Sequence, residues 1–127
     1  MNLEKVIFGA FVILACTLNF GFFIGDLGNP DYHHAGELGA TIVVNLIAMT
    51  LKFGDRTHIG AVHLATSIVA VLQLLAAAVV WVWSTRVANL PEAGEVMATV
   101  VSLSGGALVA NFISVALLIG ETLRRVR

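Results

Sequence analysis

The stretch Glu37–His63 reads ELGATIVVNLIAMTLKFGDRTHIGAVH and interrupts a nearly continuous apolar sequence with charge, glycine and an aromatic residue. Within it, the apolar run Leu38–Leu51 ends at the charged segment KFGDRTH, and a second apolar run begins at Ile59. Two apolar runs joined by a short charged turn are typical of a helical hairpin. We therefore expect the chain to be organised around this hairpin.

The composition of the whole chain indicates a membrane protein. Its 127 residues are 58% hydrophobic and 12% charged, and its mean hydropathy is +0.93, far outside the balance of a soluble domain. A spanning helix needs about 20 apolar residues, so the length allows about four crossings. We predict a single integral membrane domain, residues 1–127, folded as an all-α bundle of four transmembrane helices. The expected helices are residues 6–24, 36–52, 59–83 and 96–120, and the second is short for a straight crossing.

Several functions find no support in the residues. A net charge of -1 gives no basic face for nucleic acid, and the basic clusters lie at membrane boundaries. Cys16 is the single cysteine, so neither a disulfide nor a cysteine metal cluster can form within one chain. No Ser/His/Asp order, phosphate loop or HExxH helix can be assembled. We expect no enzyme, no catalytic residues, no metal and no cofactor.

The positions of the basic residues predict the topology. If all four segments cross, Lys5, the Lys52/Arg56 turn and the C-terminal arginines share one side of the membrane, and both acidic loops occupy the other. The positive-inside rule then places both termini in the cytoplasm. Arg86 is the exception, and Trp81 and Trp83 are expected to mark the far interface.

Two stretches of the sequence resemble each other. Ala35–Val43 reads AGELGATIV and Ala93–Val101 reads AGEVMATVV, with six identities in nine positions. An ancient duplication of a two-helix hairpin would give parallel repeats about an axis along the membrane normal. Coincidence within a narrow alphabet of Ala, Val and Gly is the alternative, and the sequence leaves both open.

Polar residues inside the apolar segments follow helical spacing and so fall on one face of each helix. They are Asn19 and Asp26; Glu37, Thr41, Asn45 and Lys52; His63, Thr66, Ser67 and Gln73; and Ser104, Asn111, Ser114 and Glu121. One interpretation is helix packing, in which amides and hydroxyls bond across helices. The other is a hydrated path, in which these groups replace part of the water shell of an ion. The two interpretations can coexist.

Charged residues and histidines gather outside the spans. Asp26, Asp31 and Glu37 form an acidic outer mouth, and the predicted cytoplasmic turn contains Lys52, Phe53, Gly54, Asp55, Arg56 and His58. His33 and His34 lie on the acidic side, whereas His58 and His63 lie near the opposite surface. This separation does not supply the two ligands of one haem within a monomer, although an oligomer could pair copies of His63.

Three resemblances to known families concern parts or the whole of the chain. Thr50–Asp55 reads TLKFGD and resembles the potassium-channel filter pattern T-V-G-[YF]-G-D, which implies a tetrameric cation pore; Lys52 stands where that family has glycine. Gly39–Asn45 reads GATIVVN and loosely resembles the G-T-L-x-V-N pattern of small four-helix fluoride channels, which implies that Asn45 is a pore-lining amide. As a whole, the chain resembles an uncharacterised family of small four-helix proteins of the bacterial inner membrane, and this resemblance implies no function.

The leading hypothesis is an oligomeric ion channel or ion-permeation protein, with cations preferred because of the acidic mouth. The residues expected to line the path are Asn45, Thr41, His63, Thr66, Gln73 and Asn111. His63 could gate with pH, because its charge changes near neutrality. The expected partners are the lipid bilayer, small ions and further copies of this chain, since so small a chain does not readily enclose a pore. The alternatives are a non-conducting accessory subunit of a larger membrane-protein complex and a haem or quinone redox anchor.

Overall fold

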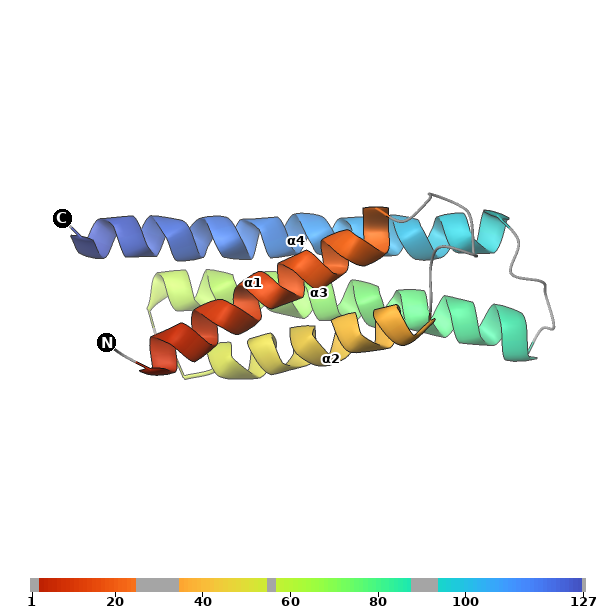
Figure 1. Ribbon diagram of the computed structural model, residues 1–127, viewed down its shortest axis with the longest axis horizontal. Helices are drawn as coiled ribbons and strands as arrows, with labels where there is room; N and C mark the ends of the chain where they lie inside the picture. The colour runs from red at the N-terminus through yellow and green to blue at the C-terminus, as the bar shows by residue number, and fades with distance from the viewer. Residues whose placement is uncertain (1–2, 25–34, 55–56, 88–93, 127) are drawn as a thin grey trace.

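Four long helices make up the protein in the computed structural model, which describes residues 3–24, 35–54, 57–87 and 94–126 (Figure 1). The helices are α1 (Leu3–Ile24), α2 (Ala35–Lys52), α3 (His58–Val82) and α4 (Gly94–Val126). A short π-helical segment, η2 (Trp83–Val87), follows α3 directly. Within these ranges all regular structure is helical, which confirms the predicted all-α fold.

The helices form an antiparallel bundle. Each helix packs against its neighbours in sequence, and α1 also packs against α4, so that the four close into a ring. Both ends of the chain and the connection between α2 and α3 lie at one end of the bundle, called here the termini end (Figure 1). The opposite end, where α1 stops and α2 and α4 begin, is called the loop end.

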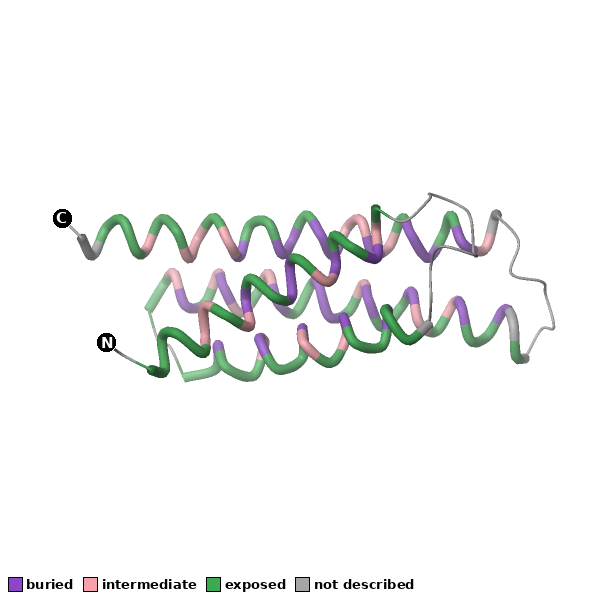
Figure 2. Tube along the Cα trace, in the orientation of Figure 1, coloured by how far each residue is buried: buried purple, intermediate pink, exposed green. Residues whose placement is uncertain are grey.

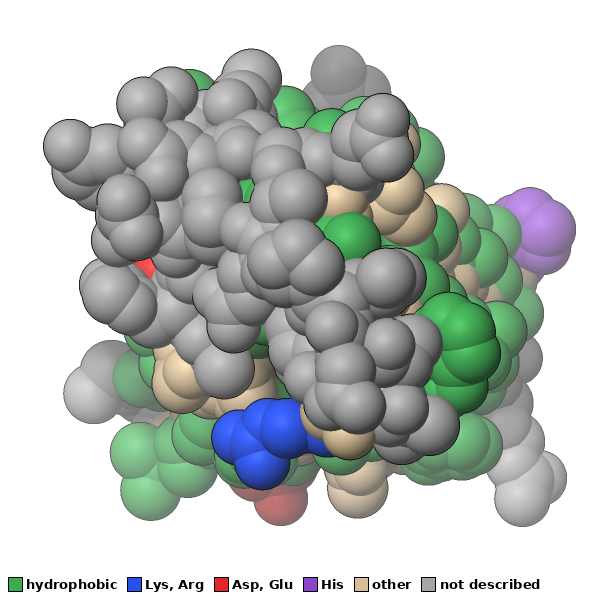
Figure 3. All heavy atoms as spheres, turned by 90° about the vertical axis from the view of Figure 1, so that its right-hand side faces the viewer, with side chains coloured by type: hydrophobic (Ala, Val, Ile, Leu, Met, Phe, Trp, Pro, Cys, Tyr) green, Lys and Arg blue, Asp and Glu red, His purple; other side chains and the backbone are tan. Residues whose placement is uncertain are grey.

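The outer surface of the bundle is apolar. Leu3–Ile24, His58–Val82 and Val96–Arg124 are long and apolar enough to cross a membrane. Large aliphatic side chains such as Leu72 (61% exposed) and Val79 (64% exposed) point outward from α3, and hydrophobic side chains show on both flanks in a view onto the loop end (Figure 3). An aqueous solvent would penalise such a surface, whereas lipid would not. The protein is therefore membrane-embedded. Of its four α-helices, α2 is the shortest, at 18 residues.

Local hydrogen bonds define the end of α2 and the start of α3. The backbone N–H of Phe53 donates to the carbonyl of Thr50 at 3.2 Å, and Gly54 follows with a φ of +98°, a left-handed conformation that glycine adopts without steric cost. Thr57 then caps α3, because its hydroxyl accepts from the N–H of Gly60 at 3.0 Å. Thr50, Leu51 and Lys52 therefore belong to the last turn of α2, so the start of the stretch that resembles a channel filter is helical.

Buried residues face the axis of the bundle along all four helices (Figure 2). Large apolar side chains close the interior toward the loop end, and Phe22 packs on Trp81 with ring centroids 6.2 Å apart. We call this group the apolar plug: Phe22, Leu38, Leu74, Trp81, Met97 and Val100. The expectation that Trp81 marks an interface is wrong, since Trp81 is buried in the plug, whereas the neighbouring Trp83 is exposed.

Two adjacent glycines let α4 approach its neighbours closely. A Cβ atom at Gly105 would lie 2.7 Å from the ring of Phe23 on α1, and one at Gly106 would lie 2.7 Å from the amide of Gln73 on α3. Both distances are far below van der Waals contact. The pair therefore sets how near α1 and α3 come to the middle of α4, as small residues do at helix contacts in membranes.

The two similar stretches of sequence have equivalent places in the fold. The first begins α2 and the second covers the first turns of α4, so both start a helix at the loop end. The helices otherwise differ from the expected ranges mainly at the termini end, where α1 begins at Leu3 and α4 continues to Val126. Whether the resemblance records a duplication stays a prediction.

Candidate functional site

A buried lysine joins three helices at the centre of the site. Lys52, the last residue of α2, is only 4% exposed. Its Nζ donates to the hydroxyl of Ser67 on α3 and, at 2.9 Å, to the hydroxyl of Ser114 on α4. We expected Lys52 in a cytoplasmic turn, whereas the structure places it in the last turn of α2 with its side chain turned into the bundle. The two serine hydroxyls explain the difference, because they offer the ammonium acceptors that the hydrocarbon lacks.

The hydrogen bonds beyond Lys52 have a defined direction. The hydroxyl of Thr66 donates to the carbonyl of His63 at 2.7 Å, which uses its one proton. The contact of 2.6 Å between the hydroxyls of Thr66 and Ser114 must then have Ser114 as the donor. The chain of donors therefore runs from Lys52 to Ser114, to Thr66 and to the backbone of His63. We call Lys52, Ser67, Ser114 and Thr66 the Lys52 network.

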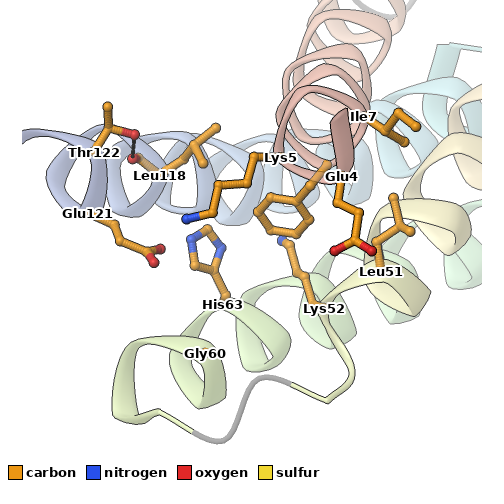
Figure 4. Close-up of a pocket in the computed structure, with 11 residues that line it drawn as sticks. Glu4, Lys5, Ile7, Leu51, Lys52, Gly60, His63, Leu118, Glu121 and Thr122 are labelled. Carbon is orange, nitrogen blue, oxygen red and sulfur yellow. Dashed lines mark hydrogen bonds between the residues drawn. The ribbon is translucent and has the colours of Figure 1, made fainter. Parts of the chain in front are cut away.

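A cavity of about 580 Å³ opens beside the Lys52 network at the termini end (Figure 4). Its walls come from all four helices and combine apolar side chains, among them Ile7 and Leu118, with charged ones. In Figure 4 the side chains of Lys5, Glu4 and Glu121 surround the space into which Lys52 and His63 point. This mixture of apolar walls and a few charged groups is typical of ligand-binding pockets.

His63 lies in the wall of the cavity and is itself buried. Its ring meets the ring of Phe8 edge to face, with centroids 5.9 Å apart and an interplanar angle of 73°. This contact between α3 and α1 fixes the imidazole at the inner side of the cavity. The predicted path residues His63 and Thr66 are thus placed next to each other and next to Lys52.

A second polar cluster lies deeper in the bundle, between α1 and α4. In the amide orientation that satisfies its neighbours, Asn19 donates to the carbonyl of Ser104 at 3.0 Å and accepts from the N–H of Leu108 at 3.0 Å. It also accepts from the amide of Asn111 at 2.9 Å. Asn19, Ser104 and Asn111 are all buried. Only Asn111 of these was a candidate path residue, although Asn19 and Ser104 stood in the same polar stripes.

The remaining path candidates lie on α2 and α3. Thr41 donates to the carbonyl of Glu37 at 2.8 Å, and Asn45 donates to the carbonyl of Thr41 at 2.8 Å, so both bond within their own helix. Both side chains are buried. The Oε1 atom of Gln73 is buried too, and no hydrogen-bond partner is recorded for it in the described part of the chain. Together with the Lys52 network and the Asn19 cluster, these side chains form what we call the polar interior. Its buried members are Asn19, Thr41, Asn45, Lys52, His63, Ser67, Ser104, Asn111 and Ser114.

The structure describes only some of the residues that were predicted for the acidic mouth and the cytoplasmic turn. Asp26, Asp31, His33, His34, Asp55 and Arg56 fall outside the described residues. Glu37 is exposed at the start of α2, and Phe53, Gly54 and His58 are exposed at the termini end. Among the residues described, no three His, Cys, Asp or Glu side chains gather where they could hold a metal ion.

Comparisons with known proteins place the chain by its sequence. No curated protein matches it, and no solved structure matches it. A family model does match, over residues 32–122, a range that contains α2, α3 and most of α4, and with them every member of the Lys52 network. The chain therefore belongs to this family, which is described as a family of unknown function (DUF6394).

Proposed function

We propose that the protein is an ion-permeation protein whose path is the polar interior of its own bundle, entered from the cavity at the termini end. The observation that carries this proposal is the burial of polar side chains inside a bundle with an apolar outer surface. Polar and ionisable groups are costly at membrane depth and usually mark ion or substrate pathways. Helix packing alone does not call for a lysine there.

The chemistry of the polar interior suits a partly dehydrated ion. The Lys52 network supplies an ammonium and three hydroxyls, and the deeper cluster supplies the amides of Asn19 and Asn111. Such groups replace part of a hydration shell, and their spread along the axis offers successive sites. Several sites in series allow an ion to enter and also to leave.

The apolar plug then acts as the gate. It closes the interior toward the loop end with side chains such as Leu74 and Met97, neither of which is exposed at all. Apolar constrictions stop ions by excluding water, and a small widening lets water and ions through. The structure thus corresponds to the closed state in this proposal.

The orientation and assembly of the protein belong to the same proposal. Lys5 and Arg124 are exposed and belong to the termini end, which we assign to the cytoplasm by the positive-inside rule. The membrane is then a bacterial inner membrane, and further copies of the chain surround the bundle. The acidic loop residues favour cations at the outer mouth, whereas Lys52 favours anions inside. The test must therefore measure cation flux and anion flux separately.

Purified protein in liposomes tests the proposal. We expect flux of potassium, sodium or chloride down an imposed gradient, and we expect Asn45→Leu, which makes a buried position apolar, to lower it about tenfold. Val43→Leu is the matched control, because Val43 lies on the same helix and is 55% exposed. Liposomes in which no ion moves under any gradient or pH would contradict ion permeation.

A second candidate is a non-conducting accessory subunit, and the apolar plug favours it as well. A permanently closed bundle would hold an ion or ligand in its cavity without passing it on. Silent liposomes together with recovery of a stoichiometric membrane-protein partner would support this function. Flux that is abolished by Asn45→Leu would exclude it.

A further inference from the structure

We infer that the cavity at the termini end is a binding site for a phospholipid whose headgroup carries both a phosphodiester and a primary ammonium. This inference goes beyond the proposed function, because a lipid can bind in the cavity whether or not ions pass through the bundle. It is carried by the depth of the cavity in the membrane, by its apolar side and by the two signs of charge that line it.

The first step is the depth of the cavity. Glu4 and Lys5 line it and lie in the first turn of the spanning segment Leu3–Ile24. Glu121 lines it from the last turn of the spanning segment Val96–Arg124. The ends of spanning helices lie where the hydrocarbon gives way to the lipid headgroups. The charged lining of the cavity is therefore at the level of the phosphates and ammonium groups of the surrounding lipids.

The second step is the size of the cavity and its apolar side. Its volume of about 580 Å³ lies within the range of about 300–1,000 Å³ that is usual for pockets holding whole small molecules. A single ion needs far less space. Ile7 on α1 and Leu51 on α2 line the cavity and are also exposed, so the cavity is open on an apolar side. A bound lipid can therefore keep its acyl chains in the bilayer while its headgroup enters the cavity.

The third step is the balance of charges. The lining contains the carboxylates of Glu4 and Glu121 and the ammonium groups of Lys5 and Lys52, and these charges cancel when His63 is neutral. A ligand with a net charge would leave an excess of one sign in a site of low dielectric constant, whereas a zwitterion would not. No unpaired group is required, because a zwitterion that enters between a carboxylate and an ammonium replaces one ion pair with two.

The fourth step distinguishes between ammonium headgroups. A primary ammonium has N–H donors for carboxylates such as Glu4 and Glu121, whereas a quaternary ammonium has none. Proteins recognise quaternary ammonium groups with cages of aromatic rings instead. Phe8 is the one phenylalanine, tyrosine or tryptophan in the cavity lining that the structure describes. The lining therefore favours ethanolamine over choline.

The lysines are the groups that suit the phosphodiester. The hydroxyls of Ser67 and Ser114 hold the ammonium of Lys52 in place, and Lys52 points into the cavity (Figure 4). Lys5 lines the same space from α1. Ammonium groups bind phosphate oxygens through charge-assisted hydrogen bonds. The cavity thus offers donors for the phosphodiester and acceptors for the primary ammonium of one headgroup.

Native mass spectrometry of the full chain released from detergent micelles tests the site. The probes are phosphatidylethanolamine, phosphatidylcholine and phosphatidylglycerol with identical acyl chains. We expect the chain to retain phosphatidylethanolamine about tenfold more tightly than either of the other lipids. Glu4→Gln with Glu121→Gln should reduce the preference over phosphatidylcholine to about twofold or less, because neutral amides do not attract the ammonium. Glu37→Gln, at an exposed position at the other end of the bundle, is the matched control and should leave the preference unchanged. Equal retention of the three lipids, or an unchanged preference in the double variant, would overturn the site.

The lysines are tested in the same way. Lys5→Gln and Lys52→Gln should each weaken the retention of phosphatidylethanolamine severalfold. Arg124→Gln removes an exposed positive charge that does not line the cavity and is the matched control. Should Lys52→Gln not fold, Lys5→Gln still provides this test, because Lys5 is exposed. Retention that no lysine substitution weakens would overturn the assignment of the phosphodiester.

Two further measurements separate the source of the ligand and the two proposals. Glycerophosphoethanolamine has the same headgroup without acyl chains. If it displaces phosphatidylethanolamine at equal concentration, the ligand is a water-soluble zwitterion and the lipid site is overturned, whereas no displacement supports a lipid. Selective lipid retention together with silent liposomes supports the lipid site and contradicts permeation. Ion flux without lipid selectivity supports permeation and contradicts the lipid site.

Discussion

The two halves of the bundle differ in what fills them. Toward the loop end, large apolar side chains such as Leu74 and Met97 make up most of the buried interior, with Thr41 and Ser84 as buried polar residues among them. Toward the termini end, the same four helices enclose the Lys52 network and a cavity of about 580 Å³. In lipid, helices associate through close packing, because lipid tails are as apolar as the side chains themselves. The apolar half therefore has the contacts that hold the bundle together.

The polar half has properties that stability alone does not require. A cavity forfeits dispersion contacts along its walls, and a buried ammonium is often replaced by an apolar side chain without loss of stability. Lys52 is nevertheless buried there and bonded to two other helices. From this comparison we expect that the apolar half mainly stabilises the bundle and that the polar half serves the proposed function, and substitutions in each half can test this division.

The largest loss of stability is expected in the apolar half. Leu74→Ala should lower the free energy of unfolding in mixed micelles by about 3 kcal/mol, because Leu74 is fully buried and its removal leaves a cavity. Leu72→Ala on the same helix is the control, since Leu72 is 61% exposed, and it should change little. If both variants lowered the free energy of unfolding equally, the assignment of stability to the buried apolar half would be wrong. If the plug is the gate, Leu74→Ala should also raise ion flux.

An intermediate loss is expected at the Lys52 network. Ser114→Ala removes an acceptor from a buried ammonium and should cost about 2 kcal/mol, the usual range for a hydrogen bond to a charged group. Ser102→Ala, at an exposed position on α4, is the matched control. In the background of Lys52→Met the cost of Ser114→Ala should fall by more than half, because the charge is gone. An unchanged cost there would show that Ser114 acts on stability independently of Lys52.

The fold could be predicted from the sequence because it depends on local properties. The lengths of the apolar runs define four helices, and the spacing of Thr41, Asn45 and Lys52 places these residues on one face of α2. The same spacing rule identified the faces that carry Ser67 and Ser114. The sequence alone therefore indicated which polar face of each of these helices points into the bundle.

The site could not be predicted to the same extent, because it depends on the axial register between helices. Lys52 and Ser114 are 62 residues apart, and no local pattern shows that they meet. Lys52 ends its helix, where a long side chain can reach either outward to water or inward to the serines, and the sequence favoured the first. The contact of Asn19 with α4 likewise depends on the close approach at Gly105, which only packing defines.

The smallest effect is expected at Asn19, where the two halves meet. Asn19→Ala removes its hydrogen bonds to Ser104, Leu108 and Asn111, yet such bonds between membrane helices are worth only about 0.6 kcal/mol on average. Thr17→Ala is the control, because Thr17 is exposed and bonds within α1 to the carbonyl of Leu14. A double-mutant cycle with Asn111→Ala should give a coupling of similar size, since the two amides bond directly. A loss above about 2 kcal/mol for Asn19→Ala would assign this amide cluster to the stabilising half. The residues that serve the proposed function would then be limited to the Lys52 network, and the proposed ion path would be confined to the cavity beside it.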